Sequence, residues 1–201
     1  MLELAIYAPG ATKAANSKAL KADGDVITVE PIAVPSGQDG VWVFATRYDN
    51  GFYVKTAEGR TISTTRMDVP AAVSSSRNIK FGKALMLVGQ AGKDYARVVG
   101  HRLELIPQSN PFDLKLGGKL AVMVRFDGKP LPDVGVETGD GEMVRKEEDI
   151  PRYKTNAQGI AEVPFSKTGL QVIGIDYKTV SSYPRLAQDD AYTATLTFEL
   201  R

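Results

Sequence analysis

His101 is the single histidine of the sequence, and it stands between Gly100 and Arg102 on a segment that we predict to be a strand. A site for a first-row transition metal usually needs several imidazole, thiolate or carboxylate ligands. Since the chain has no cysteine, only aspartate and glutamate side chains could complete a site around His101. Two interpretations stay open: a metal ligand, or a strand-edge residue hydrogen-bonded to its neighbours.

Catalysis has little support in the residue types present. The lack of cysteine excludes zinc-finger, iron–sulfur and cysteine-protease chemistry. A serine hydrolase would need His101 as its base, and the run Ser74–Ser76 lacks the Gly-x-Ser-x-Gly setting of a nucleophile elbow. Phosphate-loop and dinucleotide-binding fingerprints are also missing. We therefore predict no catalytic residues and a protein that is not an enzyme.

The acidic segment from Glu137 to Asp149 could gather oxygen ligands for calcium or supply paired glycosidase carboxylates. Its acidic residues do not follow the regular Asp-x-Asp-x-Asp-Gly spacing with a closing glutamate. Arg145 and Lys146 lie within the same stretch. A solvated loop is therefore favoured over a calcium site.

Aromatic residues gather on both sides of the sequence Asp49-Asn50-Gly51. They are Trp42, Tyr48, Phe52 and Tyr53. Because Asn-Gly readily supplies the positive φ angles of a type I′ turn, we predict a tight hairpin here. Exposed rings could stack on a sugar or a partner, which makes Trp42, Tyr48 and Tyr53 candidate ligand-binding residues. The alternative is that they pack in the core and across strands.

The composition is that of a globular protein, with 43% apolar and 24% charged residues. Lys and Arg number 25 against 24 Asp and Glu, so no net field would attract nucleic acid or an anionic membrane. No segment approaches the ~20 apolar residues of a membrane helix, so we expect no membrane insertion. The segment Met1–Tyr7 has no basic region followed by an apolar run, as in a cytosolic protein or one whose signal peptide was removed.

Alternation of apolar and polar residues predicts an all-β fold. Between Tyr192 and Leu200 every second residue is apolar, and the residues between them are threonines and Glu199. The segment from Leu120 to Phe126 alternates in the same way. In the segment Gly169–Tyr177 apolar residues fall on both faces, which favours a central strand.

A domain boundary is predicted at residues 107–111, where Pro107 and Pro111 enclose three polar residues. Each proline restricts its predecessor to extended geometry, so the segment should act as a stiff linker. We predict two tandem β-sandwich domains, an N-terminal one over residues 1–106 and a C-terminal one over residues 112–201. The strands and turns of the second half are typical of immunoglobulin-like and prealbumin-like modules.

Five segments of the chain resemble a family of exported bacterial proteins, the domain of unknown function 4198 family, which is associated with periplasmic components of nickel and cobalt transport. The segments are Gly100–Pro107, Asn110–Pro111, Phe126–Val136, Thr155–Gly159 and Tyr192–Phe198. The resemblance implies a periplasmic or secreted protein whose signal peptide has been removed. It also implies a membrane transport system, or another cell-envelope protein, as a partner.

The function predicted from these observations is that of a non-enzymatic exported accessory or binding protein, with a role in nickel or cobalt uptake implied by the resemblance. No cofactor and no metal ligand are assigned beyond the hypothesis for His101. Two alternatives remain: a structural or adhesive module that presents loops to another protein, and a carbohydrate-binding protein that uses the aromatic residues of the predicted hairpin.

Overall fold

The computed structural model describes residues 2–16, 20–23, 26–29, 35, 37–139 and 147–201, and it confirms the predicted all-β class. Helical structure in these residues is limited to three short 3-10 turns. They are η1 (Asp94–Ala96), η2 (Pro111–Asp113) and η3 (Glu147–Asp149). The acidic segment that was considered for calcium lies mostly outside the described residues. Its first residue, Glu137, pairs with Arg152 at 2.7 Å.

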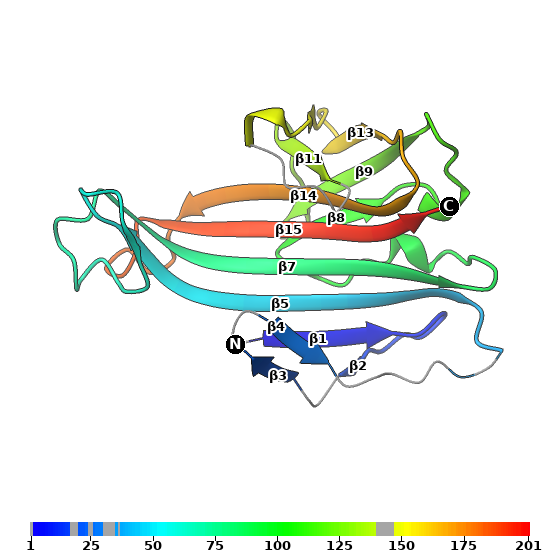
Figure 1. Cartoon of the computed structure of the whole chain (residues 1–201), viewed down its shortest axis with the longest axis horizontal. Coiled ribbons are helices and arrows are strands. Elements are labelled where there is room, and N and C mark those ends of the chain that lie inside the picture. The colour runs from blue at the N-terminus through cyan, green and yellow to red at the C-terminus, as the bar shows by residue number, and fades with distance from the viewer. Residues whose placement is uncertain (1, 17–19, 24–25, 30–34, 36, 140–146) are drawn as a thin grey trace.

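Nine strands form one large twisted sheet (Figure 1). Its order is β12 (Arg152–Lys154), β11 (Gly135–Gly139), β14 (Gly169–Val180), β15 (Asp189–Leu200), β7 (Ser74–Val88), β5 (Gly40–Lys55), β1 (Leu2–Tyr7) and β2 (Ala15–Asn16), with β6 (Thr61–Ile62) paired to β5. The pairing of β15 with β7 is parallel, and the other pairings of this sheet are antiparallel.

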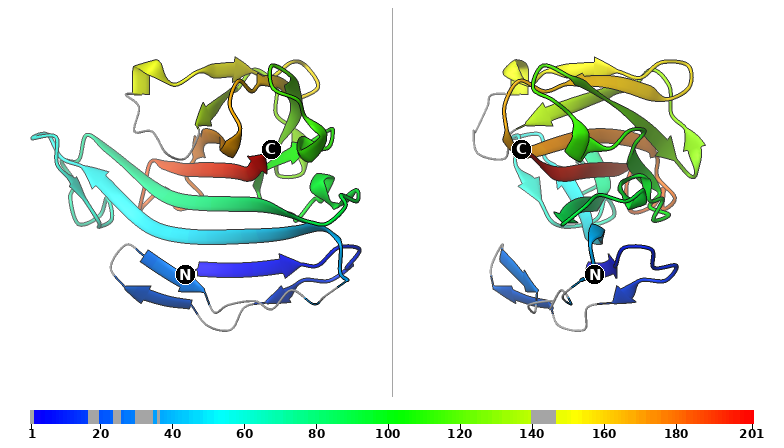
Figure 2. Two further views of the ribbon diagram at one scale, coloured as in Figure 1. Left: turned by 45° about the vertical axis from the view of Figure 1, so that its right-hand side comes forward. Right: turned by 90° about the vertical axis from the view of Figure 1, so that its right-hand side faces the viewer.

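A second, smaller sheet packs against one face of the large sheet and closes a sandwich (Figure 2). It consists of β10 (Lys129–Pro130), β9 (Lys119–Phe126) and β13 (Ile160–Pro164), with β8 (Leu103–Pro107) also paired to β9. A separate ribbon is made by β3 (Leu20–Asp23) and β4 (Val26–Val29). The core between the two sheets joins residues of both halves of the chain, from Val41 to Leu200.

Hydrogen bonds between strands cross the predicted boundary at residues 107–111. In the large sheet, β7 from the first half pairs with β15 from the second half. In the small sheet, β8 pairs with β9. The proposed division into domains 1–106 and 112–201 is therefore not confirmed, and neither is the assignment of the second half as immunoglobulin-like or prealbumin-like.

The hairpin predicted at Asp49-Asn50-Gly51 is wrong. These residues lie inside β5, which continues from Gly40 to Lys55 along its neighbour β7. The register between the two strands shifts between Asp49 and Gly51, and Gly51 has a φ of 81°. The positive φ that Asn-Gly was expected to supply for a turn is thus used in a β-bulge.

The strand predicted between Tyr192 and Leu200 is confirmed as the greater part of β15. Its alternate residues, from Tyr192 to Leu200, are buried on the inner face of the large sheet. On β5 the inner face begins with the buried residues Val41 and Val43 and continues with Ala45 and Arg47. The inner face of this strand therefore changes from apolar to charged along its length.

Candidate functional site

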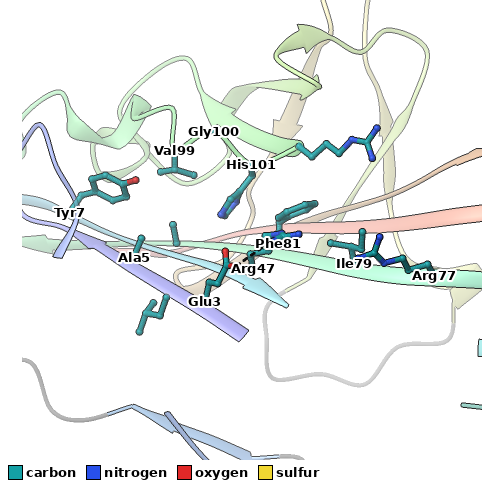
Figure 3. Close-up of a pocket in the computed structure, with 13 residues that line it drawn as sticks. Glu3, Ala5, Tyr7, Arg47, Arg77, Ile79, Phe81, Val99, Gly100 and His101 are labelled. Carbon is teal, nitrogen blue, oxygen red and sulfur yellow. Dashed lines mark hydrogen bonds and ion pairs between the residues drawn. The ribbon is translucent and has the colours of Figure 1, made fainter. Parts of the chain in front are cut away.

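A pocket of about 670 Å³ lies where the inner face of β1, β5 and β7 is covered by the segment Val99–Arg102, which leads into β8 (Figure 3). Its floor carries both apolar side chains and the charged side chains of Glu3 and Arg47. It is lined by Glu3, Leu4, Ala5, Tyr7, Ala45, Arg47, Arg77, Ile79, Phe81, Val99, Gly100, His101 and Arg102. The antiparallel register of β1 and β5 places Glu3 opposite Arg47 and Ala5 opposite Ala45.

His101 points into this pocket from above (Figure 3). Its ring packs against that of Phe81, with 5.0 Å between the ring centroids. Burial is the main cause that lowers the pKa of His101 to about 4, and the charges of Lys83 and Arg47 also lower it while Glu104 opposes them. The imidazole is therefore neutral at physiological pH and offers one N–H donor and one acceptor nitrogen.

A buried ion pair fixes the segment that carries His101. The side chains of Lys83 and Glu104 are 2% and 3% exposed, and they pair beneath this segment. Glu104 accepts hydrogen bonds from the backbone N–H of Val99 (2.8 Å) and of Gly100 (3.1 Å). The Lys83 ammonium donates to the carbonyl of Arg97 (2.9 Å). Burial lowers the pKa of Lys83, against the effect of Glu104. Both members of the ion pair therefore bind the backbone just before His101 and hold the segment from which its side chain extends.

The Glu3–Arg47 ion pair is the charged feature of the pocket floor. The Nη1 of Arg47 donates to a Glu3 oxygen at 3.1 Å, and the two side chains are 43% and 55% exposed. Both point toward His101 across the pocket (Figure 3). Exposed ion pairs of this kind contribute little to stability, so the pair can rearrange at small cost.

The other two arginines of the lining have their guanidinium groups held elsewhere. Arg77 donates from Nε and Nη2 to the two carboxylate oxygens of Asp49, and its guanidinium carbon lies 4.9 Å from the ring centroid of Tyr183. Arg102 donates in the same bidentate way to Asp127, at 2.7 and 3.1 Å. These bonds use the planar fork of each group, which is the geometry best suited to a carboxylate.

A second cavity, of about 280 Å³, shares Gly100, His101 and Arg102 with the first. Glu104, Arg125 and further residues complete its lining. His101 therefore lies between two cavities.

The predicted candidate residues have different positions. His101 lines the pocket. Trp42 is 5% exposed and packs with Leu4 and Ile6 on the opposite face of the large sheet, a position in line with the interpretation as core packing. Tyr48 and Tyr53 are half-buried on β5 and line none of the pockets described above. In the part of the chain that the structure describes, no group of three or more His, Cys, Asp or Glu side chains is arranged to hold a metal ion.

Glu3, Arg47 and Phe81 were not singled out from the sequence. They come together because β1, β5 and β7 are neighbours in the sheet, and the pairing puts Arg47 opposite both Glu3 and Phe81. One sequence signal could have indicated them: Glu3 on β1 and Arg47 on β5 are charged residues at inner-face positions of otherwise largely apolar strands.

The fold and the site define a β-sandwich protein with a polar pocket at the edge of its core. The chain belongs to the family described as a domain of unknown function (DUF4198), whose model matches residues 2–179, so the predicted family is confirmed. It is similar to an uncharacterized protein of Haemophilus influenzae, with 30% identity over 121 residues. This match covers 60% of the chain and 47% of the relative, so the chain spans less than half the length of that protein.

No solved structure matches the chain. The described residues contain no helix with the length and apolar character needed to cross a membrane.

Proposed function

We propose that this chain is a non-enzymatic binding protein of the cell envelope, periplasmic or secreted, that holds a small ligand in the pocket beneath His101. One observation carries the binding proposal. Three paired strands and the segment held by Lys83 and Glu104 line a pocket that combines apolar side chains, a neutral imidazole and a charged pair that can rearrange. Few convergent polar groups above an apolar surface are typical of small-molecule sites. The proposed location in the cell envelope rests on the family resemblance. The proposed role without catalysis rests on the lack of recognisable catalytic motifs in the sequence.

Filling the pocket tests this proposal. Ala5 lies on the floor, opposite Ala45, and a phenyl group at this position would occupy the space below His101. In a thermal-shift screen against small polar metabolites, we expect compounds that raise the Tm of the wild type to lose this effect on Ala5→Phe. Ala71 is exposed in the segment between β6 and β7 and does not line the pocket, so Ala71→Phe is the matched control. Compounds that stabilise Ala5→Phe as well as the wild type would contradict the assignment of this pocket.

A finer candidate is that the ligand is nickel or cobalt, carried as cargo for an uptake system. His101 favours it, because an imidazole without its proton is the form that binds a metal, and Glu3 lines the same pocket. Two such donors are fewer than a first-row metal usually takes, so water or a partner would have to supply the others.

Calorimetric titration with nickel and cobalt chloride tests the metal candidate. We expect micromolar binding to the wild type and at least tenfold weaker binding to His101→Gln. If neither ion binds the wild type, cargo transport of these metals is excluded and the pocket remains a site for another small ligand.

A further inference from the structure

We propose that the pocket beneath His101 takes a small organic carboxylate with an aromatic or other flat apolar body, and that Arg47 is the residue that selects the carboxylate. This inference rests on the proposed binding function and adds the chemical class of the ligand.

The first step concerns the cations of the lining. Of the three arginines, Arg77 and Arg102 each use two nitrogens on a carboxylate of the protein itself. Arg47 donates one hydrogen bond from Nη1 to Glu3, within the residues that the structure describes. Its guanidinium has five N–H donors, so the remaining edge can form the two parallel bonds that a carboxylate accepts.

The second step concerns the weakness of the existing pair. Glu3 and Arg47 are 55% and 43% exposed, so water screens their attraction. A ligand carboxylate can therefore share Arg47 with Glu3 without breaking a strong interaction. A doubly charged phosphate would be repelled by Glu3 and would find a single available guanidinium, which favours a singly charged anion.

The third step concerns the body of the ligand. Ala5 and Ala45 form an apolar part of the floor beside Arg47, and the rings of Phe81 and His101 are tilted by 32° against each other nearby. A flat ring can lie on this floor and pack against these two rings. His101 is neutral, so it adds no charge of its own and can accept a hydrogen bond from a hydroxyl group on the ligand.

Four probes that share a phenyl group separate the possible classes: benzoate, benzyl alcohol, benzylamine and phenyl phosphate. Binding is followed by amide chemical shifts of the full chain in ¹H–¹⁵N NMR spectra. We expect benzoate to bind at least tenfold more tightly than the other three. Arg47→Gln should weaken benzoate binding about tenfold to a hundredfold, because a charge-assisted bidentate contact is lost.

Arg60→Gln is the matched control, since Arg60 is exposed in the turn after β5 and does not line the pocket. It should bind benzoate like the wild type. Equal binding of benzyl alcohol, or unchanged binding in Arg47→Gln, would overturn the inference, and so would preference for benzylamine or phenyl phosphate.

Failure of this inference and failure of the proposed function give different results. If compounds bind in a way that Ala5→Phe abolishes, but carboxylates are not preferred, the carboxylate class is wrong and the pocket remains a binding site. If no compound shows binding that Ala5→Phe abolishes, both proposals are wrong.

Discussion

Replacing Glu104 by glutamine should destabilise the protein by about 3 kcal/mol, since removal of one partner of a buried ion pair costs about 3–5 kcal/mol. The pair qualifies as buried, because the Lys83 and Glu104 side chains are 2% and 3% exposed. Glutamine retains one oxygen that can accept from the Val99 or Gly100 N–H, which places the expected cost at the lower end. The remaining cost comes from the ammonium of Lys83, which is left in the core without a counter-charge.

The free energy of unfolding can be measured by urea denaturation followed through the fluorescence of Trp42. This residue is the sole tryptophan and it is buried, so its emission should report the loss of structure. The double variant Lys83→Met with Glu104→Gln should recover part of the loss, because no unpaired charge stays in the core. Glu199→Gln is the control: its pair with Arg201 is 60% and 69% exposed, and its loss should cost under about 1 kcal/mol.

The pH dependence adds an independent check on the same variant. Burial already lowers the pKa of Lys83, and loss of the Glu104 charge should lower it further. Between this lowered pKa and the ordinary value of 10.5, Lys83 is protonated in the unfolded chain and deprotonated in the folded variant. The stability of Glu104→Gln should therefore rise as the pH approaches 10. A cost below about 1 kcal/mol, or a double variant no more stable than Glu104→Gln, would refute the reasoning.

Two further predictions concern His101 and the glycines of turns. The pKa of His101 is about 4 in the folded protein and 6.5 ordinarily, so the wild type should lose up to about 3 kcal/mol of stability as the pH falls from 6.5 to 4. His101→Gln should lose less stability over this range, as measured by urea denaturation. Equal pH profiles would contradict this. Gly159→Ala should cost about 1–3 kcal/mol more than Gly128→Ala. Both glycines have a positive φ (73° and 75°), so the backbone strain is common to both, but only at Gly159 would the added Cβ meet backbone, 2.8 Å from the Leu131 nitrogen. Equal melting temperatures of the two alanine variants would refute that account.

Alternation along single strands was sufficient to predict the all-β class and the strand at the end of the chain. It worked for β15 because one face of this strand is buried from Tyr192 to Leu200. It failed at Asn50 and Gly51, where a local pattern permits either a turn or a bulge. The choice between them depends on β7, which pairs with β5 on both sides of Gly51. That pairing lies beyond what a local pattern contains.

Of the residues that line the pocket, only His101 was predicted as a site candidate from the sequence. His101 was a predicted candidate because it is the single histidine, and it lines the pocket. Glu3 and Arg47 lie 44 positions apart along the chain and become neighbours through the register of β1 and β5. A shift of the register by one residue would move Arg47 away from Glu3 and to the opposite face. Sequence patterns specify which residues can share a face, and strand pairing decides which of them meet.

The position of the pocket follows from the unequal lengths of the two sheets. In the large sheet, β5 and β7 extend well past the small sheet (Figure 2). Where the small sheet covers it, the inner face of β5 carries Val41 and Val43; beyond this cover it carries Arg47. In the region that the small sheet does not cover, the segment held by Lys83 and Glu104 covers the inner face instead. Water can enter at the edges of this segment. A long strand under a shorter cover thus turns one end of a sandwich core into a polar site, which places His101 and Arg47 where a ligand can meet both.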